Sequence, residues 1–516
     1  MKNVFFNDDV LAAEKRIYTS LNIPSLTLME NAGVNSADFI LQNFPAESKN
    51  EVVILTGKGN NAGDGFVIAR RLGIQKIDVK VLLLYNSDEI KGDALVNFNI
   101  LKNEESENIK IIYCKDEKSV MKEISHENKL IIDAIFGVGF KGEPENRIKR
   151  IIECINEFKD KTVIAIDVPS GLISSDQKSV CIKADVSLAM GVKKFYSLFY
   201  NGKEASGKLE VMNIGISEDE FTKNNLKKIF EIETKDVRNI LPPREINSNK
   251  YSNGKVFILS GSKGLTGAAY LCSLAALRTG AGAVITGIPE SVNDIMETKL
   301  TEVMKLPLSE TSEATLSLNA YADISLKLKW ADSILIGPGI SKNEETLELV
   351  RKIIKENDFN FVIDADAISA FKGNLNLLKN KNVILTPHSG EFANLIGRKS
   401  EEIRTNFYEF ARLFAEEYGV TLVLKNSPSV IANGENFYVN STGRENLATS
   451  GTGDVLAGII AAIYSQTKNP LESAISGVYI HGKCGDNLYD KFGPSSMIAS
   501  DLIDEIPNAK IKLMQA

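Results

Sequence analysis

A short stretch of glycine and hydroxyl residues near the C-terminus has the residue types that phosphate chemistry requires. Residues 446–454 have the sequence NLATSGTGD, and the apolar segment 455–463 follows directly. An apolar segment without a polar face is typical of a buried helix, whose first turn presents unpaired backbone N–H groups and the positive end of the helix dipole. Because glycines let an anion approach closely, we predict a phosphate site. Asp454 would accept a proton from an attacking hydroxyl there, or serve only as an N-cap.

Three loops in the first half of the chain carry a second set of polar residues. Short β-branched runs precede GKGNNAGDG (57–65), DAIFGVGFKG (133–142) and DVPSG (167–171). A glycine-rich turn or a strand-end Asp is often structural, but the carboxyl ends of parallel strands meet at one crevice. Oxygen atoms of Asn61, Asp133 and Ser170 could therefore ligate a cation, and Asp167 could act as an acid or base.

Hydrophobic periodicity predicts the elements that position these loops. Residues 8–43 predict two helices separated by Pro24, and a further helix is expected over 66–72, after the first glycine-rich loop. Apolar, β-branched runs alternate with amphipathic segments, which predicts a doubly wound, mostly parallel, Rossmann-like sheet. The expected strands of the first half are 51–56, 79–84, 109–113, 130–133 and 162–166.

The second half repeats this alternation with different strand ends. Strands are expected at 255–259, 283–288, 333–336, 361–363, 382–385 and 420–424, each ending in a polar or glycine-rich loop. This pattern predicts a nucleotide or phosphate site in a second α/β sheet. His388 and Lys425 could be surface residues or ligand contacts. Asp364 and Asp366 could be turn formers, or could position a hydrated Mg²⁺ ion.

Composition and charge exclude several classes of partner and site. The 516 residues include 60 basic and 67 acidic side chains, a net charge of −7 with no basic stripe, so we expect neither nucleic acid nor a membrane as a partner. Five scattered cysteines without a CxxC motif are typical of reduced thiols, and His126, His388 and His481 lack zinc-ligand spacing. With no signal-peptide pattern and no apolar run long enough to span a membrane, we expect a cytoplasmic protein.

A change of composition indicates a boundary between two domains. Residues 218–251 are rich in charge and in asparagine, and they contain Pro242 and Pro243. Segments of this kind are typical of linkers. We place the first domain at residues 1–222 and the second at residues 223–516.

The motifs GKGNNAGDGFVIARRL, DAIFGVGF and IDVPSGL, in this order, resemble the NAD(P)H-hydrate epimerase domain of bacterial YjeF-type repair proteins. The resemblance covers about residues 8–215 and implies interconversion of the R and S forms of hydrated NADH and NADPH (NADHX and NADPHX). It implies a K⁺ ion held by Asn61, Asp133 and Ser170, and a catalytic Asp167. Hydrate contacts would come from Asn60, Asn61, Ala62, Gly63, Asp64, Gly137, Val138, Gly139, Phe140, Lys141, Gly142, Glu143 and Asp167.

The motifs GSKGLTGAAYL, AALRTGAG, GPG, DADAI, LTPHSGEF and NLATSGTGDVLAG resemble the ribokinase-like superfamily and, within it, the NAD(P)H-hydrate dehydratases. The resemblance covers about residues 250–505. It implies dehydration of the S hydrate to NADH or NADPH with Mg²⁺ and with ADP converted to AMP and phosphate. The hydrate would be lined by Ala268, Gly339, His388 and Asp454. Nucleotide contacts would come from Lys425, Asn426, Ser427, Pro428, Ser429, Arg444, Glu445, Asn446, Leu447, Ala448, Thr449, Ser450, Gly451, Thr452 and Gly453.

Together the two resemblances predict a bifunctional, homo-oligomeric repair enzyme. One alternative is a ribokinase-like kinase of a vitamin or sugar with an appended Rossmann-like domain, because the Gly-Thr-Gly-Asp chemistry serves those enzymes too. The other alternative is an N-terminal domain that binds ligands without catalysis. The intact Asn61, Asp133 and Asp167 favour catalysis over the second alternative.

Overall fold

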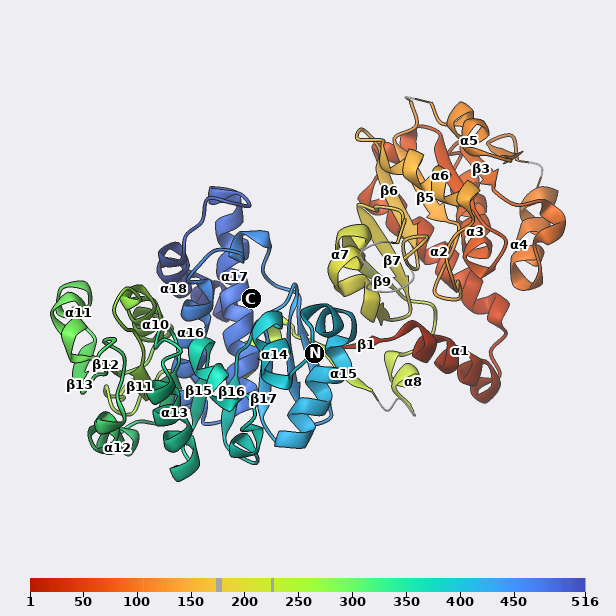
Figure 1. The fold of residues 1–516 in the computed structure, drawn as a ribbon. Helices are drawn as coiled ribbons and strands as arrows, with labels where there is room; N and C mark the ends of the chain where they lie inside the picture. The colour runs from red at the N-terminus through yellow and green to blue at the C-terminus, as the bar shows by residue number, and fades with distance from the viewer. Residues whose placement is uncertain (105, 126, 173–178, 224–226, 516) are drawn as a thin grey trace. The chain divides into compact units, whose positions relative to one another are not determined.

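The computed structural model describes residues 1–104, 106–125, 127–172, 179–223 and 227–515, so His126 lies outside the described residues. The chain divides into two compact units. We call residues 3–227 the N-terminal unit, and residues 1–2 with 228–516 the C-terminal unit. Figure 1 draws the N-terminal unit from red to yellow and most of the C-terminal unit from green to blue. No helix in the described part of the chain combines the length and apolarity needed to cross a membrane.

The N-terminal unit contains a seven-stranded, fully parallel sheet in the order β4-β3-β2-β5-β6-β7-β9. Its strands are β2 (Val52–Thr56), β3 (Val79–Leu83), β4 (Ile109–Tyr113), β5 (Leu130–Ala134), β6 (Thr162–Ile166), β7 (Val186–Met190) and β9 (Lys208–Met212). Outside this sheet, β1 (Lys2–Phe5) pairs in parallel with β8 (Lys193–Lys194). The strand order reverses between β2 and β5. In such sheets, ligands bind beyond the carboxyl ends of the strands at this reversal.

The helices of the N-terminal unit cover both faces of its sheet. They are α1 (Asn7–Leu21), α2 (Ser25–Asn43), α3 (Asn60–Ile74), α4 (Gly92–Asn103), α5 (Glu117–Glu123), α6 (Asn146–Asn156), α7 (Tyr200–Ser206) and α8 (Glu218–Thr222). Alternate residues of β2 enter two different apolar cores: Ile54 packs with residues of α1 to α4, and Val53 packs with residues of α5 and α6. Burial on both faces explains why these strands are continuous apolar runs rather than alternating ones.

The C-terminal unit is built on a second, mostly parallel sheet. Its order is β13-β12-β11-β14-β15-β16-β17-β18-β19-β10, and only β17-β18-β19 pair antiparallel. The strands are β10 (Lys228–Glu231), β11 (Lys255–Leu259), β12 (Ala283–Pro289), β13 (Met304–Leu308), β14 (Ser333–Ile336), β15 (Phe361–Ile363), β16 (Val383–Leu385), β17 (Thr421–Leu424), β18 (Ser429–Asn433) and β19 (Asn436–Asn440). The order reverses between β11 and β14.

One face of this second sheet is covered by α10, α16, α17 and α18, whose apolar residues form one core with alternate strand residues (Figure 1). The helices of the unit are α9 (Thr234–Ile240), α10 (Thr266–Thr279), α11 (Asn293–Lys299), α12 (Tyr321–Leu328), α13 (Glu344–Glu356), α14 (Ser389–Ile396), α15 (Ser400–Tyr418), α16 (Thr452–Thr467), α17 (Pro470–Phe492) and α18 (Ala499–Gln515). The α16 segment is buried along nearly its whole length, as its unbroken apolar sequence predicted.

The predicted alternation of strands and helices is confirmed in both units, and the limits of the predicted strands differ from the observed ones by at most one residue. The sequence did not predict β1, β7, β8, β9, β10, β13, β18 and β19. One expectation is wrong. Residues 60–65 were expected in a loop before a helix at 66–72, but α3 already begins at Asn60. The glycines of this segment are needed for packing, because a Cβ atom at Gly63 would lie 2.4 Å from the Met29 sulfur and one at Gly65 would lie 2.8 Å from the Ala134 Cβ.

Close contact between α10 and α16 provides a test of this packing. A Cβ atom at Gly458 would lie 2.2 Å from the Cys272 carbonyl oxygen, so Gly458→Ala must separate the two helices. We expect this substitution to lower the free energy of unfolding by about 1–3 kcal/mol, as overpacking does elsewhere. Gly267→Ala is the matched control on α10, where a Cβ atom would meet nothing within 4 Å. Urea unfolding measures the free energy of unfolding of both variants, and equal values would contradict the packing argument.

Candidate functional site

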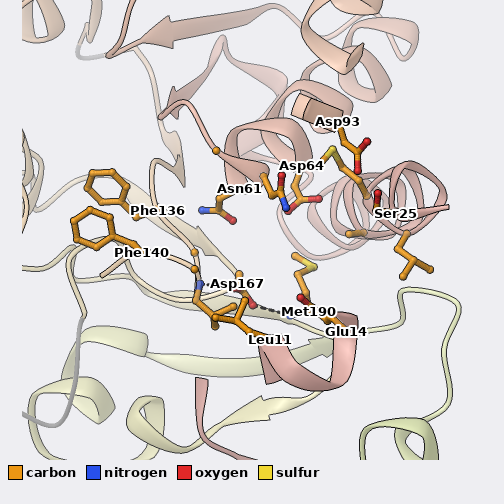
Figure 2. Close-up of a pocket in the computed structure, with 18 of the residues that line it drawn as sticks. Leu11, Glu14, Ser25, Asn61, Asp64, Asp93, Phe136, Phe140, Asp167 and Met190 are labelled. Carbon is orange, nitrogen blue, oxygen red and sulfur yellow. Dashed lines mark hydrogen bonds between the residues drawn. The ribbon is translucent and has the colours of Figure 1, made fainter. Parts of the chain in front are cut away.

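A cavity of about 470 Å³ opens in the N-terminal unit between α1, α2 and the loops that follow β2, β5 and β6 (Figure 2). Of the predicted hydrate contacts, the residues that line it are Asn60, Asn61, Asp64, Gly137, Val138, Gly139, Phe140 and Asp167. Ala62, Gly63, Lys141, Gly142 and Glu143 are not part of this lining. Gly63 packs against Met29, whereas Lys141 and Glu143 are exposed and pair with Asp8 and Lys149. The cavity brings most of the predicted residues together at the strand reversal.

Asp167 follows β6, and its carboxylate is held by groups from two other segments. Its Oδ1 lies 2.5 Å from the ammonium group of Lys194, and its Oδ2 accepts a hydrogen bond of 3.0 Å from the Val138 N–H. Its backbone has a φ of 69°, in the left-handed region that is rare for a residue other than glycine. Lys194 is 1% exposed and also donates to the Met190 carbonyl at 2.7 Å. Asp167 is therefore fixed at the cavity wall with its charge compensated.

Gly137 allows the close approach of the residues around it. A Cβ atom there would lie 3.0 Å from the Asp167 Oδ2 and 3.4 Å from the Asn61 Oδ1. Asn61 is 6% exposed, and neither its amide oxygen nor its amide nitrogen has a hydrogen-bond partner among the described residues. A buried amide without a partner is costly, so a ligand is the simplest partner for Asn61.

Asp133 and Ser170, the other two predicted cation ligands, contact each other directly. The Ser170 hydroxyl donates to the Asp133 Oδ1 at 2.5 Å, and the Ser170 N–H donates to its Oδ2 at 2.8 Å. Burial raises the pKa of Asp133 to about 6, although these hydrogen bonds oppose the shift. A buried carboxylate, a hydroxyl and the amide oxygen of Asn61 are the hard oxygen donors that suit a K⁺ ion. The residues present fit such an ion.

The sequence did not predict two further groups of this site: Glu14 of α1, which lines the cavity, and Lys194, the last residue of β8, which pairs with Asp167 at the cavity wall. Burial and, to a smaller extent, the nearby Asp167 charge raise the pKa of Glu14 to about 7, although Lys194 opposes the shift. Burial also raises the pKa of Asp64 well above its usual range, with Asp167 and Glu14 adding to the effect. Neither Glu14 nor Lys194 lies in a glycine-rich motif or directly after a predicted strand, so the local patterns contained no signal for them.

The predicted phosphate site of the C-terminal unit lies at the start of α16. The helix begins after Gly451, which has a φ of 87°, and no side chain caps its first turn. A Cβ atom at Gly453 would lie 3.4 Å from the Lys425 Nζ, so the ammonium group lies over this first turn. Uncapped amides, a helix dipole and a lysine together form a binding site for an anion.

Asp454 stands in the same turn, beside further carboxylates. Lys425 donates to the Asp364 Oδ1 at 2.8 Å, and Asp364 is 1% exposed. Burial opposes charge on Lys425, but Asp364, Glu391 and Asp454 outweigh it and raise the pKa of this lysine. Burial raises the pKa of Asp454 to about 7; the Asp364 charge adds to the shift and Lys425 opposes it. Asp454 thus has the proton affinity of a general base that works near neutral pH.

The four predicted hydrate-lining residues of this unit come from different segments. Ala268 and Gly339 touch, because a Cβ atom at Gly339 would lie 3.0 Å from the Ala268 Cβ. His388 pairs with Lys425 in an isolated parallel bridge, and its Nδ1 accepts the Gly390 N–H at 3.0 Å. Its side chain is 59% exposed, so the imidazole remains accessible to a ligand.

The predicted nucleotide-binding residues form two segments. In the first segment, residues 425–428 connect β17 to β18, and Ser429 begins β18. In the second segment, the Arg444 guanidinium lies 4.5 Å from the centre of the Tyr489 ring, and the Tyr489 hydroxyl donates to Glu445 at 2.7 Å. The Asn446 side chain is 1% exposed and donates to the Gly485 carbonyl at 2.8 Å. Residues 444–446 are therefore anchored to α17, and exposed residues such as Ser450 follow before α16 begins.

Comparison with known proteins agrees with both halves of this description. A family model described as NAD(P)H-hydrate dehydratase matches residues 256–508, and one described as YjeF-related protein N-terminus matches residues 25–195. The bifunctional NAD(P)H-hydrate repair enzyme Nnr of Moorella thermoacetica is 36% identical over 495 residues, which cover 94% of this chain and 92% of that relative. The chain belongs to the family of bifunctional NAD(P)H-hydrate repair enzymes.

Other members of this family and a solved structure extend the comparison. The bifunctional repair enzyme Nnr of Escherichia coli is 28% identical over 511 residues, covering 98% of this chain and 93% of that relative. A ribokinase-like superfamily protein from Enterococcus faecalis is 24% identical, with a TM-score of 0.50 over 56% of this chain and 97% of its own. That likeness concerns the fold alone. The predicted fold class, a Rossmann-like domain with a ribokinase-like domain, is confirmed.

The buried ion pair of Lys194 and Asp167 at the cavity wall leads to a prediction about the stability of the protein. We expect Lys194→Met to lower the free energy of unfolding by roughly 3–5 kcal/mol at pH 7, because it leaves the Asp167 carboxylate buried without its partner. Lys208→Met removes a lysine that is 72% exposed and should change stability by less than about 0.5 kcal/mol. Urea unfolding, monitored by circular dichroism, compares the free energies of unfolding of the two variants. A Lys194 variant as stable as the control would show that the pair does not support the fold.

Proposed function

We propose that this chain repairs hydrated nicotinamide cofactors in two steps. Residues 1–222 interconvert the R and S forms of NADHX and NADPHX, and residues 223–516 dehydrate the S form to NADH or NADPH. The observation that carries the proposal is the Asp454 carboxyl group, with its pKa near 7, in the uncapped first turn of α16 beside Lys425. A base next to an anion site is what transfer of a phosphoryl group to a ring hydroxyl requires.

In the dehydration step, Asp454 accepts the proton of the ring hydroxyl as its oxygen attacks the terminal phosphorus of ADP. The amides of Thr452 and Gly453 and the ammonium of Lys425 stabilise the charge on the transferred phosphoryl group. AMP leaves, the C–O bond of the phosphorylated hydrate then breaks, and a ring proton is lost, so NADH or NADPH forms with phosphate. Ala268, Gly339 and His388 line the hydrate, and residues 425–429 and 444–453 hold the nucleotide.

Asp364 and Asp366 are the residues that would hold Mg²⁺ together with the phosphates of the nucleotide. Asp364 is already paired with Lys425, and the Asp366 Oδ2 accepts the Ser341 N–H at 3.0 Å. One or two carboxylates with substrate phosphates are a common way to bind this ion. When bound, it supplies positive charge to the phosphates.

In the epimerisation step, the N-terminal cavity binds the hydrated nicotinamide ring near Asp167. Asn61, Asp133 and Ser170 would hold K⁺, which supplies positive charge at the edge of the cavity. Asp167 touches the hydrate and exchanges a proton with it. The epimerase thereby converts the R form, which the dehydratase does not accept, into the S form.

The deciding experiment follows absorbance of reduced nicotinamide in a mixture of R and S NADPHX with Mg²⁺, K⁺ and ADP, and then with ATP. Full recovery with ADP is the expected result. Recovery that stops after the S fraction would remove the epimerase from the proposal. Phosphorylated product without NADPH would instead support a ribokinase-like vitamin or sugar kinase, since those enzymes use the same Gly-Thr-Gly-Asp chemistry.

Asp454→Asn should lower the dehydratase rate by roughly 10²–10⁴-fold, the usual contribution of a general base, and leave epimerisation unchanged. Because the base must be ionised and burial raises its pKa to about 7, the wild-type dehydratase rate should rise with pH through about 7 and then level off. Asp504→Asn, at an aspartate that is 77% exposed, is the control. A variant with wild-type dehydration would exclude Asp454 as the base.

Replacing K⁺ by tetramethylammonium should slow epimerisation and lower the thermal midpoint of the wild-type protein, because an ion that binds only the folded state stabilises it. Asp133→Asn should remove both responses, since it removes the charge of the buried carboxylate at the cation site. Dehydration of pure S hydrate serves as the internal control and should not change with Asp133→Asn. Equal epimerase rates and midpoints in the two salts would argue against a K⁺ site.

A further inference from the structure

Glu14 lines the N-terminal cavity from a segment of the chain that carries none of the predicted site residues. It belongs to α1, whereas Asp167 follows β6, and both line the cavity in the view of Figure 2. Apolar side chains, among them Leu11 and Met190, line the cavity around them. A carboxyl group in a partly apolar wall holds its proton more tightly than one in water.

The charged groups around Glu14 set its proton affinity near neutrality. Burial and the negative charge of Asp167 together raise the pKa of Glu14 to about 7, and the positive charge of Lys194 opposes the shift. Asp64 of α3 and Tyr18 of α1 also face this group, and the pKa of each is raised by burial and by the Glu14 charge. Around neutral pH, Glu14 therefore exists both with and without its proton.

The reaction needs an acid and a base at neighbouring atoms. The hydroxyl-bearing carbon of the hydrate is bonded to the ring nitrogen, so it is a hemiaminal carbon. Inverting it requires breaking a bond at that carbon. When the C–N bond breaks, the hydroxyl loses its proton and becomes an aldehyde, and the nitrogen gains a proton. Oxygen and nitrogen are attached to the same carbon, so two carboxyl groups close to each other can serve both atoms.

We infer that Glu14 is a second catalytic residue of the epimerase, acting with Asp167 as an acid–base pair that opens and recloses the hydrated ring. This rests on the epimerase activity proposed above. Asp167 accepts the hydroxyl proton while Glu14 donates a proton to the ring nitrogen, and the C–N bond breaks to give the aldehyde. After rotation, the nitrogen attacks the other face of the aldehyde; Asp167 returns its proton to the oxygen and Glu14 recovers the nitrogen proton. No atom is gained or lost.

Lys194 is a positioning residue in this scheme. Its ammonium group lies 2.5 Å from the Asp167 Oδ1, compensates the charge of that carboxylate and holds it in place at the cavity wall. Asp64 is less suited to the acid role, because it is only 9% exposed and its pKa is raised well above its usual range. Glu14 is thus the carboxyl group whose proton can be both given and recovered.

The test compares Glu14→Gln with the wild type in the full chain, using pure R NADPHX. We expect the epimerase kcat to fall by roughly 10²–10⁴-fold with KM within a few-fold, since an acid is lost but the cavity keeps its shape. The wild-type kcat should decline as pH rises through about 7, because the acid must be protonated, and this decline should be absent from the variant. Asp38→Asn, at a carboxylate that is 38% exposed on α2, is the matched control.

Each further readout either supports or overturns the assignment. Dehydration of pure S NADPHX must be unchanged, which confines the effect to the N-terminal unit, and the urea unfolding curve must match that of the wild type, which shows that this unit is folded. Glu14→Asp should restore part of kcat and the decline with pH, and it replaces Glu14→Gln as the test if that variant does not fold. In ¹⁸O-labelled water, the first turnovers should keep the original hydroxyl oxygen; label gained at every turnover would overturn ring opening.

A Glu14→Gln kcat within threefold of the wild type, or an effect on KM alone, would overturn the role of Glu14. If the wild type itself fails to equilibrate the epimers, the fault lies with the proposed epimerase function rather than with this inference. The same assay therefore separates the two failures.

Discussion

A lysine ammonium taken out of water needs a carboxylate partner within hydrogen-bonding distance, because the cost of desolvating either charge alone is several kcal/mol. This constraint acts at the carboxyl edge of both sheets. Lys194 is 1% exposed and lies 2.5 Å from Asp167, and Lys425 lies 2.8 Å from Asp364, which is 1% exposed. Both pairs join segments that are far apart in the sequence. Each pair therefore fixes strand-end loops where a ligand of a doubly wound sheet would bind.

A third carboxyl group close to each pair acquires a pKa near 7. In the N-terminal unit this group is Glu14 and in the C-terminal unit it is Asp454, and burial is the main cause in both. In each case the aspartate of the pair raises the pKa further and the lysine only partly opposes it. A group with a pKa near the working pH transfers protons most effectively. The same physical arrangement thus suits acid chemistry at Glu14 and base chemistry at Asp454.

Glycines contribute to the two units in different ways. Gly451 adopts a left-handed conformation that only a residue without a Cβ atom adopts readily, and it leaves the first turn of α16 open to a ligand. Gly63 and Gly65, in contrast, lie inside α3 and allow it to pack closely on α2 and on the sheet. The sequence does not distinguish these uses, because a glycine-rich segment after a strand is compatible with both a loop and a closely packed helix. This ambiguity is why the start of α3 was placed too late.

The sequence by itself determined the strands that precede the site loops, the two sets of strand-end motifs, and the family to which the chain belongs. Apolar runs and glycine-rich strand ends are local patterns, so they can be recognised without knowing how distant parts of the chain pack. Only the tertiary structure decided that Lys194 neutralises Asp167, that Glu14 enters the same cavity, and that Lys425 lies over the start of α16. These relations depend on how distant segments pack, and a pKa depends on burial and neighbouring charge, neither of which is encoded in the spacing of residues along the chain.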